Sequence, residues 1–396
     1  MSTFLNKLSC HRYRAGHAAS VKEYAEKTGE SVLFSEEAAL TTFPVRYVDD
    51  VTPALSIPAI PSTLYVCLIH DSAIIGSSNL FIAKTGEFLY DLLIKARSHK
   101  NYRLSDRVLK KHHSKPVRLA ERYVMHYMNA GMKMDAAISL ICNFSNNYYH
   151  FIFEVIAKFY LLDKCQIPNN VPIIVDKRVR DVPQLMELLH MFAGHRRIRY
   201  LRPRYKCQVR KLYCISSVNQ IIPNYVDIKQ VRTEDNLFCP DAIRFVRQRF
   251  LDYALSSTNH PKRFYIARKH TTNRSYNEQE LTKIAHEEYG FEIVSPEEYS
   301  VAEQFALFAG AECIIGASGA ALSNIVCCKP GCRILVLFSH NINLTIFSGI
   351  AGCLDIDMRY LIGKTDDPLS LQASYNIDTD NFRKSITEWL IPSIIQ

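Results

Sequence analysis

The chain has 396 residues, of which 48% are hydrophobic and 22% charged, and it carries a formal net charge of +9. This composition is typical of a globular protein with room for two domains of ordinary size. No apolar run approaches the roughly 20 residues that a membrane span needs, and Met1 to Ser20 contains no apolar signal core. We therefore expect a cytoplasmic protein. Twelve cysteines without a C-x-x-C pair predict reduced core thiols, and neither a zinc site nor a disulfide framework.

The first patterned region consists of short apolar segments separated by turn residues. They cover 64–70, 72–76, 79–83 and 87–91. Strands with turn chemistry at this spacing predict a β-meander, which we interpret as a β-rich addition that serves as a platform.

Continuous apolar strands then alternate with helical patterns, as in a parallel α/β sheet. The strands are predicted at 136–142, 171–175, 198–201 and 211–216, and the helices at 150–163 and 182–193. This region predicts one Rossmann-like unit.

The periodicity lapses around Asn219 to Pro240 and then resumes, which predicts a second Rossmann-like unit. Its strands are predicted at 263–267, 291–294, 313–315, 333–338 and 358–361, and its helices at 241–256, 278–289, 296–308 and 343–351. We expect domains at 1–225 and 226–396, with an amphipathic C-terminal helix around Trp389 that folds back on the first domain.

A small-residue loop, Gly316-Ala317-Ser318-Gly319-Ala320, follows a predicted buried strand and precedes a helical turn. Parallel sheets bind ligands at the carboxyl ends of their strands, and small residues let a ligand approach backbone N–H groups. A phosphate or a sugar hydroxyl fits this loop. Close packing of strand and helix explains the same composition, and the loop alone does not decide between the two.

Cations follow a neighbouring strand of the same predicted sheet. Arg268, Lys269 and Arg274 leave the strand 263–267 at its carboxyl end, and Asn277-Glu278 begins the next helix. Two guanidinium forks beside a helix N-terminus suit a diphosphate, although surface cations are the alternative. Because both loops belong to one sheet, we expect them to face one cleft.

His150 follows a buried strand and opens a helix, with Glu154 one turn further along the same face. The pair suits a general base, or a phosphate ligand, with its orienting carboxylate. The alternative is a satisfied, partly buried histidine among aromatic neighbours. Two D-x-D strings, Asp355-Ile-Asp357 and Asp378-Thr-Asp380, resemble metal-binding acids, but neither follows a buried strand. We predict no metal.

Eight basic residues and no acidic one lie between Arg196 and Lys211. An anionic membrane surface and an acidic or phosphorylated glycan are candidate partners. A solvated edge explains the run equally well, and the absence of any nucleic-acid-binding motif argues against nucleic acid.

Several ordered motifs over residues 135–340 together resemble glycosyltransferase family 61. They are N-x-x-x-H-F-x-x-E from Asn146, Y-I-A-R-K with Arg274 and Asn277-Glu278, F-E-I-V-S-P-E-E, and I-G-A-S-G-A-A-L-S-N-I with K-P-G. The preceding β-rich segment resembles the bacterial capsule or O-antigen members. Ser318 stands where the family motif has a histidine.

The resemblance implies a GT-B architecture of two Rossmann-like domains facing a cleft, and inverting, metal-independent transfer from a nucleotide sugar to a glycan or lipid-linked glycan. Expected catalytic residues are His150 and Glu154, and expected donor contacts are Arg268, Arg274, Glu278, Ser318, Gly319, Ala320 and Asn324. A non-catalytic glycan- or nucleotide-binding protein is the alternative, because a fold alone does not imply turnover. Peripheral attachment to the inner face of the membrane is a further expectation.

Overall fold

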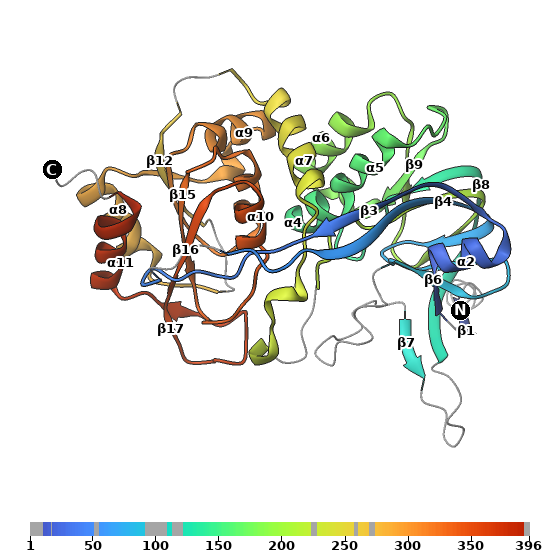
Figure 1. Ribbon diagram of the computed structural model, residues 1–396, viewed down its shortest axis with the longest axis horizontal. Coiled ribbons are helices and arrows are strands. Elements are labelled where there is room, and N and C mark those ends of the chain that lie inside the picture. The colour runs from blue at the N-terminus through green and yellow to red at the C-terminus, as the bar shows by residue number, and fades with distance from the viewer. Residues whose placement is uncertain are drawn as a thin grey trace, which may run out of the picture. The chain divides into compact units, whose positions relative to one another are not determined.

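The computed structural model divides into two compact units (Figure 1). The described residues are 11–16, 18–50, 55–91, 109–112, 122–222, 228–256, 260–268 and 274–391. The first unit contains the described residues up to Ala38, Pro61–Val218 and Ile222. The second contains Ala39–Ile60, Asn219–Ile221 and the described residues from Ile228 onward. The predicted boundary at 225/226 lies outside the described residues.

Within its described residues, the first unit is built on an 11-stranded sheet with the main order β10-β9-β8-β11-β4-β5-β6-β2. Its strands are β1 His11–Gly16, β2 Ala18–Ser20, β3 Ser31–Leu40, β4 Ile60–Ile75, β5 Phe81–Ile82, β6 Phe88–Tyr90, β7 Leu109–His112, β8 Arg122–Ser139, β9 Ile173–Asp176, β10 Ile198–Leu201 and β11 Tyr205–Ile215. Strands β10, β9, β8 and β11 run parallel, whereas β4 is antiparallel to β11 and β5. The predicted α/β class is confirmed.

The long strands of this sheet differ from the prediction. The segments 64–70 and 72–76 form one strand, β4, which is irregular at Asp71, where φ is +51°. The predicted strands 136–142 and 211–216 overlap only the last four residues of β8 and the last five of β11. A continuous apolar run predicts a strand only where both of its faces are buried. The other parts of these strands contain polar residues, so the sequence does not predict them as strands.

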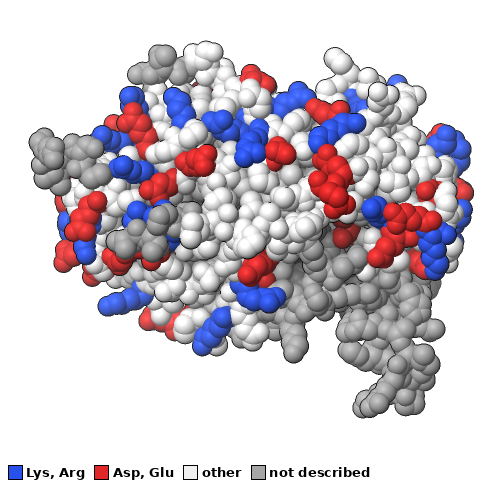
Figure 2. Space-filling model, viewed as in Figure 1, with Lys and Arg blue, Asp and Glu red and all other residues white. Residues whose placement is uncertain are grey.

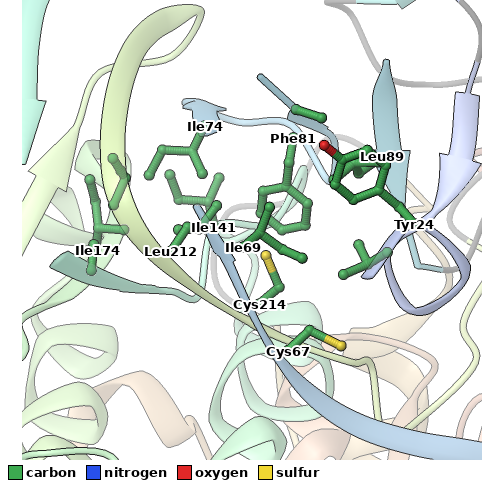
Figure 3. Close-up of a cluster of buried hydrophobic side chains, with 14 of the residues drawn as sticks. Tyr24, Cys67, Ile69, Ile74, Phe81, Leu89, Ile141, Ile174, Leu212 and Cys214 are labelled. Carbon is green, nitrogen blue, oxygen red and sulfur yellow. The ribbon is translucent and has the colours of Figure 1, made fainter. Parts of the chain in front are cut away.

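Figure 3 shows the buried side chains on one face of the sheet. Leu212 and Cys214 of β11 pack there with Ile69 of β4, and Tyr24 of α2, Val21–Thr28, belongs to the same cluster and lies near Leu89. Alternate residues of β11 point to the opposite face, as the pleat requires.

The connection from β8 to β9 is an irregular helix. It consists of α4 Tyr148–His150, a π-helical turn η1 Phe151–Val155, a 3-10 turn η2 Ile156–Lys158 and α5 Phe159–Lys164. A 3-10 turn η3, Lys177–Asp181, and α6, Pro183–Ala193, then connect β9 to β10. Single π-helical turns occur frequently at functional sites.

The second unit is a doubly wound sheet of parallel strands in the order β13-β12-β14-β15-β16. Its strands are β12 Arg263–Ile266, β13 Glu292–Val294, β14 Cys313–Ala317, β15 Arg333–Phe338 and β16 Asp357–Ile362, and a small ribbon pairs β17 Lys364–Thr365 with β18 Tyr375–Asn376. Its α-helices are α7 Pro240–Tyr253, α8 Glu278–Tyr289, α9 Val301–Gly310, α10 Ser348–Cys353 and α11 Thr379–Ser385. It also contains a 3-10 helix, η7 Ala320–Cys327, and a π-helix, η8 Ile386–Leu390. Short 3-10 turns are η4 Ile228–Gln230, η5 Thr233–Asp235 and η6 Pro296–Glu298. The strands and helices predicted for this region are all present, with shifted ends.

The helices of the second unit form two layers. α8 and α11 pack together over one face of the sheet, and α7, α9, η7 and α10 pack together over the other (Figure 1). The C-terminal helix, which the sequence led us to expect on the first domain, instead belongs to the second unit, because Phe382, Ile386 and Leu390 cover its sheet. No helix in the described part of the chain is both long enough and apolar enough to cross a bilayer.

Residues 39–60 form a segment that we call the strap, and it belongs to the second unit although it lies early in the chain. Isolated bridges join Thr41 to Phe238 and Tyr47 to Tyr360. Ser348 Oγ donates to the carbonyl oxygen of Phe43 at 2.8 Å. No sequence pattern predicts these contacts.

Candidate functional site

Arg268 and Arg274 converge on one backbone oxygen. Arg274 Nη1 donates to the Ser318 carbonyl oxygen at 3.1 Å, and Arg268 Nη2 donates to the same oxygen. Arg268 follows β12 and Ser318 follows β14. The chain continues from β12 to β13 on one side and reaches β14 on the other, so the strand order reverses here. Doubly wound sheets bind ligands at this switch point.

The two guanidinium groups lie close together, since both donate to the Ser318 carbonyl oxygen. Among the described residues, no carboxylate forms an ion pair with either side chain. Burial, and then the charge of Arg268, lower the pKa of Arg274, and the Arg274 Nε is buried without a hydrogen-bond partner in the described part of the chain. A buried donor without a partner is costly, and an anion would satisfy it. The arrangement therefore suits a diphosphate.

The glycines of the small-residue loop have different roles. A Cβ atom at Gly319 would lie 2.8 Å from Arg268 Nη2, so this glycine makes room for the guanidinium. A Cβ atom at Gly316 would lie 3.2 Å from the Cβ of Ile266, which is close packing between neighbouring strands. Gly319 precedes η7, which begins at Ala320. Gly316 thus serves close packing and Gly319 makes room for a cation, and binding of a ligand by the loop stays a prediction.

Other residues predicted to bind the donor have partners within the unit. Asn324 is fully buried and donates from Nδ2 to Gln304 Oε1 at 2.8 Å, which ties η7 to α9. The Ser318 N–H donates to the Leu337 carbonyl oxygen at 2.9 Å. Glu278 Oε1 accepts the backbone N–H of Arg268 at 2.8 Å. Lys269 lies outside the described residues, and the donor roles of these residues remain predictions.

His150 and Glu154 form a side-chain pair in the first unit. His150 Nδ1 and Glu154 Oε2 are hydrogen-bonded, and their side chains are 16% and 6% exposed. Asn147 caps the helix by accepting the backbone N–H groups of Tyr149 and His150. The ring of Phe144 lies 5.0 Å from the imidazole. The pair is therefore held in one orientation on the irregular helix that follows β8, and the imidazole keeps partial access to solvent.

Sequence reasoning missed a polar network that reaches the loop before His150. Arg178 Nε donates to Asp176 Oδ1 at 3.1 Å, and its Nη2 donates to the Asn143 carbonyl oxygen at 3.0 Å. Ser77 Oγ also donates to the fully buried Asp176. The network ties the end of β9 to the loop that leads to His150. Asp176 and Arg178 follow the predicted apolar strand 171–175. Their position at its carboxyl end could have identified them as candidate site residues.

The basic run does not act as one surface. Arg196 donates to the carbonyl oxygens of Pro168 and Ile167, both at 2.7 Å, and is structural. Lys206 and Arg210 instead line a groove of about 360 Å³. The other charged residues that line it are Lys84, Lys133 and Asp71. On the face seen in Figure 2, basic and acidic side chains are interspersed.

Three of the four acids in the two D-x-D strings, Asp357, Asp378 and Asp380, have structural partners. Asp357 Oδ1 accepts from Arg46 at 2.9 Å, and its Oδ2 accepts from Trp389 Nε1 at 3.0 Å. Asp378 caps α11, and Asp380 lies 3.7 Å from Arg383. Among the described residues, no cluster of three or more His, Cys, Asp or Glu side chains could hold a metal ion.

Residues 148–335 match the family model of Glycosyltransferase 61. The matched region begins at α4 and ends within β15, so it contains both the His150 and Glu154 pair and the two arginines on Ser318. No curated protein matches the chain. The family match, which spans both clusters, supports a glycosyltransferase of family 61.

Proposed function

We propose that the protein is an inverting glycosyltransferase that moves a sugar from a nucleotide-sugar donor to a glycan acceptor in bacterial surface polysaccharide biosynthesis of the capsule or O-antigen type. The proposal includes a GT-B arrangement of the two units and a cytoplasmic location with peripheral membrane contact. The observation that carries it is the convergence of Arg268 and Arg274 on Ser318.

In this proposal the guanidinium pair binds the diphosphate of the donor. Negative charge grows on the diphosphate as the bond between the anomeric carbon and the phosphate oxygen breaks. Fixed cations at that position stabilise the transition state more than the ground state. Backbone N–H groups of Gly319 and Ala320, at the start of η7, supply further donors. These groups provide the charge that a metal ion provides in other glycosyltransferases, so no metal is required.

His150 acts as the general base in this proposal. The acceptor hydroxyl oxygen attacks the anomeric carbon on the face opposite the diphosphate, which inverts the configuration. Because Nδ1 is hydrogen-bonded to Glu154, Nε2 is the nitrogen that takes the hydroxyl proton. Glu154 holds the ring and stabilises the imidazolium that forms.

The test is hydrolysis of a panel of nucleotide sugars by the purified protein, followed by transfer to glycan acceptors. We expect one donor to release its nucleotide, and an acceptor to increase that rate. Nucleotide binding without turnover of any donor would favour the non-catalytic binding protein instead.

A further inference from the structure

A chain of hydrogen bonds ends on the backbone of Arg268. The hydroxyl groups of Tyr265 and Tyr276 lie 2.9 Å apart. The Tyr276 hydroxyl donates to Glu278 Oε1 at 2.8 Å, and the same oxygen accepts the backbone N–H of Arg268 at 2.8 Å. One carboxylate oxygen thus joins the start of α8 to the end of β12.

The chain of hydrogen bonds is set in rigid surroundings. Tyr265 is fully buried, and the ring of Tyr276 stacks on Tyr375 with centroids 5.2 Å apart and an interplanar angle of 9°. Burial is the main cause that raises the pKa of both Tyr265 and Tyr276 far above the usual value for a phenol. Both hydroxyls therefore keep their protons at any working pH, and Tyr276 remains a donor to Glu278.

The other end of the arginine loop is anchored separately. The backbone N–H of Arg274 donates to the Gln372 carbonyl oxygen at 3.1 Å. Asn277 accepts the Ile377 N–H at 2.9 Å and donates to the Ile377 carbonyl oxygen at 3.0 Å. Arg274 thus has anchors that do not involve Glu278, whereas the backbone of Arg268 is held by Glu278.

We propose that Glu278 and Tyr276 are positioning residues that hold Arg268 against Ser318, and that Glu278 is not itself a ligand of the donor. The proposal rests on the proposed function, in which Arg268 binds the donor diphosphate. A carboxylate in direct contact with a diphosphate would repel it. A carboxylate that accepts the Arg268 N–H orients the cation without such contact.

Two substitutions of Glu278 separate geometry from charge. Glu278→Gln keeps an acceptor oxygen at the same place and removes a negative charge near the anion site. Glu278→Ala removes the acceptor altogether. If Glu278 positions Arg268, the glutamine variant keeps anion affinity and the alanine variant loses it. Tyr276→Phe removes one hydrogen-bond partner of the carboxylate, and we expect its anion affinity to lie between those of the glutamine and alanine variants.

The experiment is calorimetric titration of the full chain with two probes, inorganic pyrophosphate and UDP. We expect Glu278→Ala to weaken binding of both probes by the same factor, about tenfold or more, because an oriented hydrogen bond to a charged group is lost. Glu278→Gln should stay within about threefold of wild type. Glu287→Ala, an exposed carboxylate on the same helix, is the matched control. Thermal unfolding of each variant separates lost binding from lost folding.

Different failures have different signatures. If Glu278 contacted the nucleoside, Glu278→Ala would weaken UDP binding and leave pyrophosphate unchanged, which overturns the positioning role. Equal pyrophosphate affinity in the wild type, Glu278→Ala and Tyr276→Phe would overturn it too. A wild-type protein that binds neither probe would refute the proposed donor site, and the inference with it.

Discussion

Arg268 and Arg274 donate to the same carbonyl oxygen of Ser318, although five residues separate them in the sequence. One oxygen cannot offset two positive charges, and the described residues provide no carboxylate ion pair for either. Two guanidinium groups held this close repel each other, and a bound anion would offset that repulsion.

Arg268→Ala and Arg274→Ala should each weaken UDP binding by roughly 1.5–3 kcal/mol, the range for hydrogen bonds to charged groups. Because the two side chains share one acceptor, the losses in the double variant should not add. Calorimetry measures both effects. Arg244→Ala, which removes an exposed arginine paired with Asp241, should change nothing. Unaltered affinity in the two single variants would remove the diphosphate assignment.

Replacing His150 by Asn should lower kcat by about 10²–10⁴-fold, the usual contribution of a general base. Glu154→Gln should cause a smaller loss, because the imidazole remains but loses its carboxylate partner. Steady-state rates with saturating donor measure both effects, and the UDP affinity of each variant serves as the control. A His150→Asn enzyme with the wild-type rate would leave the pair a purely structural role.

Activity should survive EDTA. The cations on Ser318 supply positive charge at the leaving group, and Asp357 is engaged by Arg46 and Trp389. The measurement is transfer rate before and after chelation, followed by addition of Mn²⁺ or Mg²⁺. Loss of turnover that either ion restores would contradict metal independence.

Gly352→Ala should destabilise the protein by about 1–3 kcal/mol, the usual cost of overpacking, because a Cβ atom there would overlap the ring of Phe43 in the strap. Gly310→Ala is the matched control, since a Cβ atom at that position meets no other group within 4 Å. Urea denaturation of both variants compares the free energies of unfolding. Equal stability would mean that the strap packs loosely.

Changing Lys133, Lys206 and Arg210 to Ser should weaken sedimentation with anionic vesicles at low salt, by roughly 1 kcal/mol for each cation near the surface. Vesicles of varied anionic lipid content provide the measurement. Lys283→Ser, which removes an exposed cation on α8, is the control. A wild-type protein that ignores anionic vesicles would eliminate membrane attachment, and an unchanged acceptor KM in the triple variant would eliminate an acidic glycan in the groove.

The sequence predicts the second unit better than the first for a physical reason. Strands such as Arg333–Phe338 lie between two helical layers, so their apolar runs are continuous and their limits are visible. In the first unit, Ala137–Ser139 of β8 are buried in succession, whereas residues 131–135 alternate between exposed and half-buried and form no continuous apolar run.

The sequence predicts that Arg268 and Ser318 lie close together, because each follows one of two adjacent parallel strands. It cannot identify the partner of Glu278, since hydrogen-bond geometry decides whether that carboxylate faces a ligand or a backbone N–H. The strap is invisible for another reason: Tyr47 and Tyr360 are far apart in the sequence, and no local pattern relates them.

The strap also limits which fragments of the protein can fold when expressed alone, and it affects when the second unit can fold during synthesis. A fragment that begins at the predicted boundary would lack Thr42 and Phe43, against which Gly349 and Gly352 pack. During synthesis, the strap leaves the ribosome before any residue of the sheet it joins. Its apolar side chains cannot pack against α10 and β16 until those elements have been synthesised. Chaperone dependence of the nascent chain, and failure of the two halves to fold when expressed apart, are the expected consequences in the cell.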